Sequence, residues 1–383
     1  MRDSVAIAGA WTDLDGDGSR DVALVSRSVP ILSESETPRT ARFEVISSRD
    51  GQLLQQLDLG VEVPIDADCL TSIGARDGAP ELLAFVAMDG VRILVATQAP
   101  KSTVVRDASG VVAWIPDEDG DGAAELVVQR ANKSPALLPS RTWTADVDRY
   151  RSVRGSAASV GDVDADGVVD IIARRSESEG VVAVVSGKSG KLIVAVDETA
   201  SGLWSSGQDV VSGAEAQDVD GDGQRDFYVA SFDPIEGGTS GSVFCISGRD
   251  GKRLQRWESS GEFDGGASHL TLIDDEDGDG VRELFLTLRR AYNPPVTAGA
   301  TALVLSGKSL APLDRFDAPF GAYPANRALF MPARLPSAPS GVAFASWGAG
   351  LVSSLEYAQR RVGGGFVHVR RRGATSAEAW VVP

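Results

Sequence analysis

The sequence is poor in the residues on which many enzymes and cross-linked extracellular domains depend. Its 383 residues include two cysteines and two histidines. Cys69 and Cys245 lie far apart, each within an apolar segment, which predicts two small buried side chains and not a disulfide framework. His269 and His368 lack the spacing of metal ligands. The chain also has no GxSxG motif, which argues against a serine hydrolase.

Long apolar runs and excess positive charge are also missing. No run reaches the roughly 20 residues that a membrane-spanning helix needs. The start of the chain lacks a signal-peptide pattern and enters an acidic motif almost at once, so we expect the chain to be part of a longer polypeptide. The formal net charge of −17 argues against nucleic acid as a partner, because phosphates would be repelled. Aromatic residues, at 6%, are sparse for a carbohydrate-cleaving groove.

What the sequence does contain is one acidic motif in five copies. DVDGDGQRDFYVA spans residues 218–230, and the other copies begin at residues 13, 117, 162 and 275. Positions one, three, five and nine are acidic, position six is glycine, and an apolar strand-like run follows. At about 5 Å and an effective dielectric of about 20, each carboxylate pair costs about 3 kcal/mol. Hard oxygen donors with a glycine turn suit calcium, so we predict a cation in these loops. Solvated acidic turns that bind nothing are the alternative.

The five copies are not EF-hands. An EF-hand needs a bidentate glutamate at position twelve, between two helices. Position twelve is apolar in every copy and lies in a β-type run. Five divalent ions would change the formal net charge of −17 to about −7, so the acidity says little about partners.

The spacing of the motifs predicts a repeat architecture. Degenerate copies at 72–85 and 332–346 bring the number of units to seven, and a second signature, xSGxxGxxL, predicts a hairpin between the third and fourth strands of a unit. Units of roughly 45 to 60 residues that are rich in short β runs are typical of propeller blades. We therefore predict an all-β fold, a seven-bladed β-propeller of four-stranded antiparallel blades with the acidic loops between first and second strands.

The expected blades form a single domain over residues 1–383. The third and fourth strands of the third blade are hard to recognise in the sequence. A terminal strand at 377–382 is expected to pair beside the first strand at 4–10 and close the ring, leaving no free sheet edge. The approximate blade limits are 1–60, 61–106, 107–150, 151–200, 201–260, 261–318 and 319–383.

Acidic loops followed by apolar β runs resemble FG-GAP/VCBS repeats, found in the integrin α-subunit β-propeller and in many bacterial surface proteins. The resemblance covers nearly the whole chain and departs from the family in units two and seven, where ligands are missing. It implies structural calcium in each loop, with a backbone carbonyl at position seven (Ser19, Ala123, Val168, Gln224 or Val281) completing the shell. The implied side-chain ligands are Asp13, Asp15, Asp17, Asp21, Asp117, Asp119, Asp121, Glu125, Asp162, Asp164, Asp166, Asp170, Asp218, Asp220, Asp222, Asp226, Asp275, Asp277, Asp279 and Glu283.

The affinity of such sites bears on location. Extracellular calcium modules bind with dissociation constants of about 10⁻⁴–10⁻³ M, so their sites would be empty at cytosolic calcium. At about millimolar calcium the tighter limit adds about 1.4 kcal/mol of stability per site. We therefore expect an extracellular, cell-surface or periplasmic protein.

Ligands are expected on the face opposite the acidic loops. Antiparallel strands place the acidic loops and the predicted hairpins on one face, and the long irregular segments on the other. Aromatic residues on those segments could contact a protein or glycan ligand, or could cap the blade cores. The basic groups at 360–361 and 370–372 could hold a polyanionic glycan, or could be a solvated edge. The candidate ligand residues are Trp204, Phe263, Tyr292 and Tyr323, with Phe232 and Phe320 in similar segments.

These features favour a non-catalytic calcium-binding propeller that acts as a binding or adhesion module, or as a rigid scaffold of a larger cell-surface protein. A polysaccharide lyase or another carbohydrate-active enzyme is the alternative, because some lyases use calcium-bearing propellers. Neither a nucleic-acid partner nor a membrane span in this chain is expected.

Overall fold

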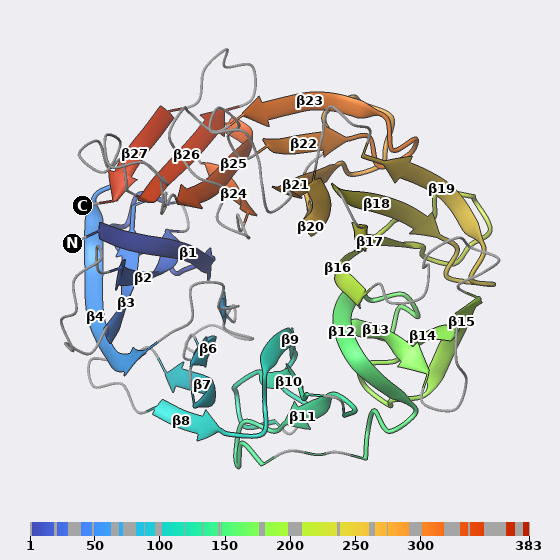
Figure 1. Cartoon of the computed structure of the whole chain (residues 1–383), viewed down its shortest axis with the longest axis horizontal. Coiled ribbons are helices and arrows are strands. Elements are labelled where there is room, and N and C mark those ends of the chain that lie inside the picture. The colour runs from blue at the N-terminus through green and yellow to red at the C-terminus, as the bar shows by residue number, and fades with distance from the viewer. Residues whose placement is uncertain are drawn as a thin grey trace.

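The chain forms a ring of small antiparallel sheets (Figure 1). In each sheet the strands follow chain order, with the first strand nearest the centre of the ring and the last at the rim. This arrangement is a β-propeller. The computed structural model describes residues 2–18, 21–29, 40–47, 50–62, 69–71, 82–87, 89–95, 102–118, 120–131, 133–144, 146, 148–175, 181–197, 209–235, 238–259, 265–273, 275–290, 301–317, 330–335, 338–347, 365–371 and 378–382.

The described strands make up seven sheets. The first three sheets contain β1 (Arg2–Ala10), β2 (Val22–Val29), β3 (Thr40–Ile46) and β4 (Leu53–Glu62); β5 (Cys69–Thr71), β6 (Leu82–Ala87), β7 (Gly90–Val95) and β8 (Ser102–Val105); and β9 (Gly110–Ile115), β10 (Glu125–Gln129) and β11 (Ala136–Leu138). The fourth and fifth contain β12 (Val153–Gly161), β13 (Asp170–Arg175), β14 (Val181–Val185) and β15 (Leu192–Asp197); and β16 (Asp209–Glu215), β17 (Phe227–Ile235), β18 (Gly238–Ile246) and β19 (Arg253–Glu258). The last two contain β20 (Gly265–Leu272), β21 (Leu284–Arg290), β22 (Thr301–Leu305) and β23 (Pro312–Asp317); and β24 (Phe330–Leu335), β25 (Ala338–Trp347), β26 (Gly365–Arg371) and β27 (Glu378–Val382).

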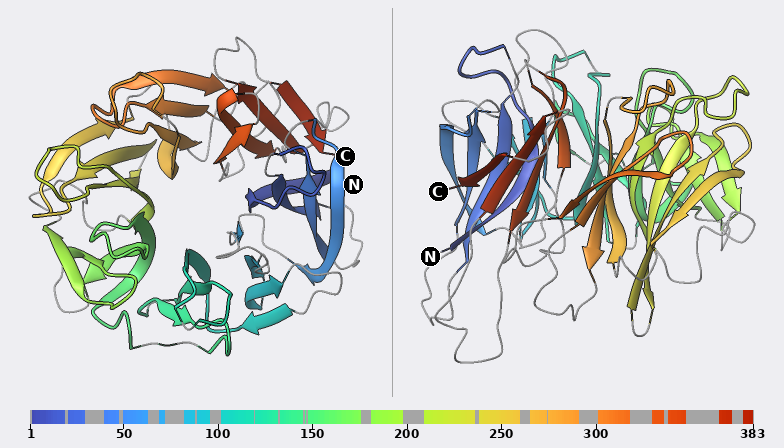
Figure 2. Two further views of the ribbon diagram at one scale, coloured as in Figure 1. Left: turned by 180° about the vertical axis from the view of Figure 1, so that it is seen from behind. Right: turned by 90° about the horizontal axis from the view of Figure 1, so that it is seen from above.

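The middle strands whose side chains the structure describes, such as β6, β10 and β14, are buried on both faces, which explains their unbroken apolar runs. In β14, Val182 and Val184 pack toward the fifth sheet, whereas Ala183 and Val185 pack toward the third. All four side chains are at most 1% exposed. From the first sheet to the sixth, neighbouring sheets pack face to face, so the described core is a series of inter-sheet clusters, and the connections lie at the two faces of the ring (Figure 2).

The predicted pairing of the terminal strand with the first strand is wrong. β27 pairs with β26 at the rim of the last sheet, and in the described part of the chain β1 pairs with β2 alone. The physical reason is radial order: β1 is the innermost strand of its sheet and β27 is the outermost of the other, so their edges do not meet. The first and last sheets instead meet through contacts of β1 with β24 and β25.

The third sheet is the irregular one. Its described strands number three, β9 to β11, and the following segment returns to form an isolated bridge between Leu137 and Asp146. The Leu137 N–H donates to the Asp146 carbonyl at 3.2 Å, and the Asp146 N–H donates back at 2.7 Å. This bridge satisfies the outer edge of β11 where the other sheets have a fourth strand.

Candidate metal centres

Each acidic loop joins the first strand of a sheet to the second. We number each loop by its sheet, so the loops that begin at residues 13, 117, 162, 218 and 275 are the first, third, fourth, fifth and sixth. In four loops, three carboxylates present oxygen atoms that all lie within 4.8 Å of one another. Two oxygens on opposite sides of one calcium ion would be about 4.8 Å apart, given calcium–oxygen distances of about 2.3–2.6 Å. The convergent groups therefore fit a single hard cation. They are Asp13, Asp15 and Asp17; Asp162, Asp164 and Asp166; Asp218, Asp220 and Asp226; and Asp275, Asp277 and Asp279.

The carboxylate at position one shapes the loop. In four loops it accepts hydrogen bonds from the backbone N–H groups of positions four and six, at 2.6–2.9 Å. In the remaining loop, Asp162 accepts from the N–H groups of Asp166 and Gly167 at 2.9 and 3.1 Å. These bonds wrap the loop around its first carboxylate and turn the other acidic side chains toward it. The pKa of Asp13 lies below its usual range, chiefly because its carboxylate accepts the Gly18 N–H.

Position four has a left-handed backbone that the sequence motif only partly reveals. Gly16, Gly120, Gly221 and Gly278 occupy it with φ between 74° and 80°. In the fourth loop the residue is Ala165, with φ of 60°. An L-residue with a side chain is disfavoured in this region, so Ala165 is the strained copy of the turn.

The carboxylate at position nine is buried, and in three sheets it accepts hydrogen bonds from both the acidic loop and the hairpin between the third and fourth strands. Asp21, Glu125, Asp170, Asp226 and Glu283 are all at most 1% exposed. Each accepts the backbone N–H of position two of its own loop at 2.7–3.1 Å. Three of them also accept the N–H of a hairpin glycine between the third and fourth strands. These bonds join Gly187 to Asp170 at 3.0 Å, Gly248 to Asp226 at 3.2 Å and Gly307 to Glu283 at 2.9 Å.

In the fourth, fifth and sixth sheets these bonds confirm that the acidic loop and the hairpin share one face of the ring. They also explain the glycine of the hairpin motif. A Cβ at Gly187 would lie 1.9 Å from the Val169 carbonyl oxygen, and one at Gly248 would lie 1.9 Å from the Arg225 carbonyl oxygen. The hairpin can therefore reach the buried carboxylate only if this residue has no side chain.

Burial controls the protonation of these buried carboxylates. It raises the pKa of Asp170 to about 7, against the opposing effect of the Gly187 and Val163 N–H bonds. Burial likewise raises the pKa of Asp226 and of Glu283. It also raises the pKa of Asp164, where the charge of Asp166 adds to the effect. A bound cation would reverse these shifts, because it favours the charged carboxylate.

Neighbouring acidic loops contact each other. An Arg225 guanidinium N–H donates to the Asp162 carbonyl at 3.1 Å, from the fifth loop to the fourth. The Arg282 N–H donates to the Gln217 side chain at 3.1 Å, which joins the sixth unit to the fifth. The loops of the fourth, fifth and sixth sheets therefore form a continuous belt on one face.

The structure brings together most but not all of the implied ligands. Asp21, Asp170 and Glu283 lie outside the convergent groups, and in the fifth loop Asp222 does so while Asp226 lies inside. In the third loop Asp119 lies outside the described residues, as does the position-seven residue Ser19 of the first loop. Asp117, Asp121 and Glu125 are described, and Asp121 accepts a hydrogen bond from Ser140 at 2.8 Å.

Five of the six expected ligand-binding aromatics lie outside the described residues. Trp204, Phe263, Tyr292 and Tyr323, together with Phe320, lie outside the described residues, and Phe232 is described only as part of the backbone of β17. The acidic part of the degenerate copy at 72–85, residues 72–81, also lies outside them. Cys245 is a buried free thiol, and burial raises its pKa above the usual range. In the part of the chain that the structure describes, no helix could span a membrane.

Two features of the site were missed by sequence reasoning. One is the left-handed position four, for which the DGDG spelling of four loops was the available signal. The other is the joining of position nine to the hairpin glycine, which links residues 17 to 24 positions apart. No local sequence pattern predicts that hydrogen bond.

Comparison with known proteins gives likenesses among solved structures alone. No protein-family model and no curated protein matches the sequence. Among solved structures, the chain is similar to Sqt1 of Saccharomyces cerevisiae at 11% identity and a TM-score of 0.48, over 100% of this chain and 97% of that one. It is also similar to the Dos1 propeller at 13% identity and a TM-score of 0.44, over 89% of this chain and 80% of that one. Likenesses at this level say nothing about a ligand or a reaction.

Proposed function

We propose that the chain is a calcium-stabilised, seven-bladed β-propeller in which each sheet is one blade and the acidic loops hold structural calcium ions. The observation that carries this proposal is the convergence of three carboxylates in each of four equivalent loops. Their ligands would be the acidic positions already named, with the position-seven carbonyl as a further oxygen donor. When bound, the ion would neutralise the mutual repulsion of the carboxylates.

The buried position-nine carboxylates make the ion a structural element of the blade. Asp170, Asp226 and Glu283 each contact both the acidic loop and the hairpin of the third and fourth strands. A cation that favours the charged form of this carboxylate strengthens its hydrogen bonds to both connections. Calcium would therefore hold the inner and outer strands of a blade in register. The likeness to FG-GAP/VCBS repeats is consistent with this role and remains a prediction.

The propeller would act as a non-catalytic binding or adhesion module, or as a rigid scaffold, of an extracellular, cell-surface or periplasmic protein. Two considerations support this. The carboxylates at positions one and nine already accept backbone hydrogen bonds, so they are poorly suited to act as a catalytic base. Sites of this type bind calcium at about 10⁻⁴–10⁻³ M, and only a calcium-rich compartment fills them.

Calcium stoichiometry tests the proposal. Equilibrium dialysis against about millimolar calcium should give about five ions per chain, with dissociation constants near 10⁻⁴–10⁻³ M. Asp220→Asn should lower the stoichiometry by one, because Asp220 belongs to the convergent group of the fifth loop. Asp58→Asn removes the same charge from an exposed strand position and should leave the calcium stoichiometry unchanged. A chain that binds no calcium, or that loses an ion in both variants, contradicts the proposal.

The binding role needs its own test. A glycan array probed with the calcium-loaded chain should identify an acidic or neutral glycan ligand, and silence there favours the scaffold role. Incubation with a panel of acidic polysaccharides checks the alternative. Accumulation of unsaturated sugar products, followed by ultraviolet absorbance, would show a lyase and contradict the non-catalytic proposal.

A further inference from the structure

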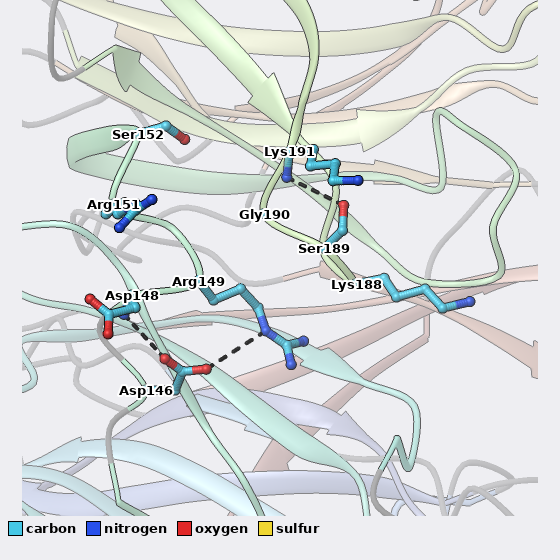
Figure 3. A pocket seen from close by; sticks show the side chains of 9 residues that line it. All are labelled: Asp146, Asp148, Arg149, Arg151, Ser152, Lys188, Ser189, Gly190 and Lys191. Carbon is cyan, nitrogen blue, oxygen red and sulfur yellow. Dashed lines mark hydrogen bonds and ion pairs between the residues drawn. The ribbon is translucent and has the colours of Figure 1, made fainter.

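A hollow on the acidic-loop face has the opposite charge from the rest of the molecule. It lies between the segment that follows the third sheet and the hairpin of the fourth, and it has a volume of about 580 Å³ (Figure 3). We call it the basic hollow. Its basic lining is Arg149 and Arg151 on one side and Lys188 and Lys191 on the other.

The irregular third sheet creates this hollow. In place of a fourth strand, the chain bridges back at Asp146 and then runs beside the hairpin of the next sheet. The two backbones touch, since a Cβ on Gly190 would lie 1.8 Å from the Arg149 carbonyl oxygen. Arg149 fixes the arrangement, because its guanidinium contacts Glu118 at 2.6 Å and the Gly187 carbonyl at 3.4 Å.

The charge of the hollow stands out in an acidic chain. Four basic side chains line it, against the two carboxylates of Asp146 and Asp148. Even when Glu118, which pairs with Arg149, is counted with them, the local formal charge is positive, whereas the chain as a whole carries −17. Such a local reversal of sign in a concave surface attracts anions, and salt screens the distant negative charges more than the near positive ones.

The equivalent hairpin of the fifth sheet shows why the lysines are available. There, Lys252 pairs with Asp250 of the same hairpin, and Arg249 lies 3.8 Å from Asp222 of the acidic loop. In the fourth sheet, serine takes the place of that hairpin aspartate. Lys188 and Lys191 are exposed, and within the described residues neither ammonium group forms an ion pair. Lys188 also interacts electrostatically with the Asp164 carboxylate of the acidic loop.

The lining also includes a hydroxyl group that has no hydrogen-bond partner in the described part of the chain. Ser152 lines the hollow, and its Oγ is buried with no hydrogen-bond partner among the described residues. A buried hydroxyl without a partner is costly, and an anion that accepts a hydrogen bond from it would remove that cost. Serine, lysine and arginine donors around one open, polar depression are suited to an oxyanion.

We propose that the basic hollow binds a sulfate or carboxylate group carried by an acidic polysaccharide. The lining is polar throughout, with no aromatic or aliphatic side chain to act as the anchor that protein interfaces use at their centres. Its openness lets one charged group enter while the polymer runs across the face. This site lies on the acidic-loop face, opposite the face from which the sequence predicted binding.

A matched pair of variants tests the inference. Lys188→Gln/Lys191→Gln removes two charges from the basic hollow, and Arg249→Gln/Lys252→Gln removes two from the same positions of the neighbouring hairpin. All four side chains are exposed, and thermal unfolding checks that both variants fold. Binding is measured by calorimetry with a sulfated oligosaccharide, a uronate oligosaccharide, neutral dextran, inorganic sulfate and polyglutamate.

We expect the hollow variant to weaken binding of the sulfated or uronate oligosaccharide by about tenfold, since each ammonium contact contributes a few-fold. The control variant should change it by less than about twofold. The inference is overturned if wild type binds neither oligosaccharide at millimolar concentration, if both variants weaken binding equally, if inorganic sulfate alone binds, or if polyglutamate is preferred. All titrations share one calcium concentration, so the result does not depend on whether the acidic loops bind the ion.

Discussion

Replacing Ala165 by glycine should stabilise the protein. Ala165 occupies position four of the fourth acidic loop with φ of 60°, where the other loops have glycine. A left-handed conformation costs a residue with a side chain about 1–2 kcal/mol. Glycine in its place avoids this strain but gains about 0.4–1 kcal/mol of unfolded-state entropy that folding must overcome. The net expected gain in the free energy of unfolding is therefore about 0.5–1 kcal/mol.

The reverse change provides the matched test. Gly221 is the equivalent residue of the fifth loop, with φ of 77°. A Cβ added there would meet nothing within 4 Å, so Gly221→Ala isolates the conformational cost. It should lower the free energy of unfolding by about the amount that Ala165→Gly raises it. Ala214→Gly, in strand β16, should destabilise and so show that glycine is not stabilising in general.

Urea unfolding followed by circular dichroism measures these differences, with all variants in the same calcium concentration. Opposite signs for Ala165→Gly and Gly221→Ala are the expected result. If both variants destabilise, or if Ala165→Gly leaves the midpoint unchanged while Gly221→Ala does too, the left-handed turn does not determine loop stability and the reasoning fails.

Three further predictions concern the buried contacts. Gly248→Ala should cost more than about 2 kcal/mol in urea unfolding, because its Cβ would lie 1.9 Å from the Arg225 carbonyl oxygen; a loss below about 0.5 kcal/mol would contradict that contact. Asp226→Asn should lower the free energy of unfolding in EDTA by about 1–3 kcal/mol. The two carboxylate oxygens now accept the backbone N–H groups of Val219 and Gly248, and the asparagine NH2 group would face one of these donors without being able to accept its hydrogen bond. In EDTA, Asp170 should stabilise the fold fully below about pH 4 and lose that contribution as the pH rises through about 7, because its pKa is raised on folding. The difference between wild type and Asp170→Asn, measured by urea unfolding from pH 4 to 8, isolates this effect, and a flat difference would refute it.

The repeat signal predicted the all-β, propeller-type architecture because it is written into every unit. An acidic turn followed by an apolar run fixes the end of a first strand and the start of a second, as at Asp162 and β13. The SG signature likewise places the hairpin before β15. Apolar runs buried on both faces predict packed sheets whatever the sequence of a particular unit.

Contacts between segments far apart in the chain could not be predicted from the sequence. The position of β27 depends on radial order within the last sheet, which strand propensity does not encode. Within the described residues the third sheet has no fourth strand, and the only sign of this in the sequence was a weak β signal after β10. The basic hollow lies between two short segments, 146–152 and 188–191, and nothing in the sequence predicts that their basic side chains line one depression.

The most direct measurement of the central claim is thermal unfolding of the whole chain in calcium, in magnesium and in EDTA. Calcium should raise the midpoint well above that in EDTA, since each filled site adds about 1.4 kcal/mol at about ten times its dissociation constant. Magnesium should do less, because it demands a smaller, near-octahedral shell. An identical midpoint in calcium and EDTA would contradict the account: the acidic loops would then fold and persist without the ion.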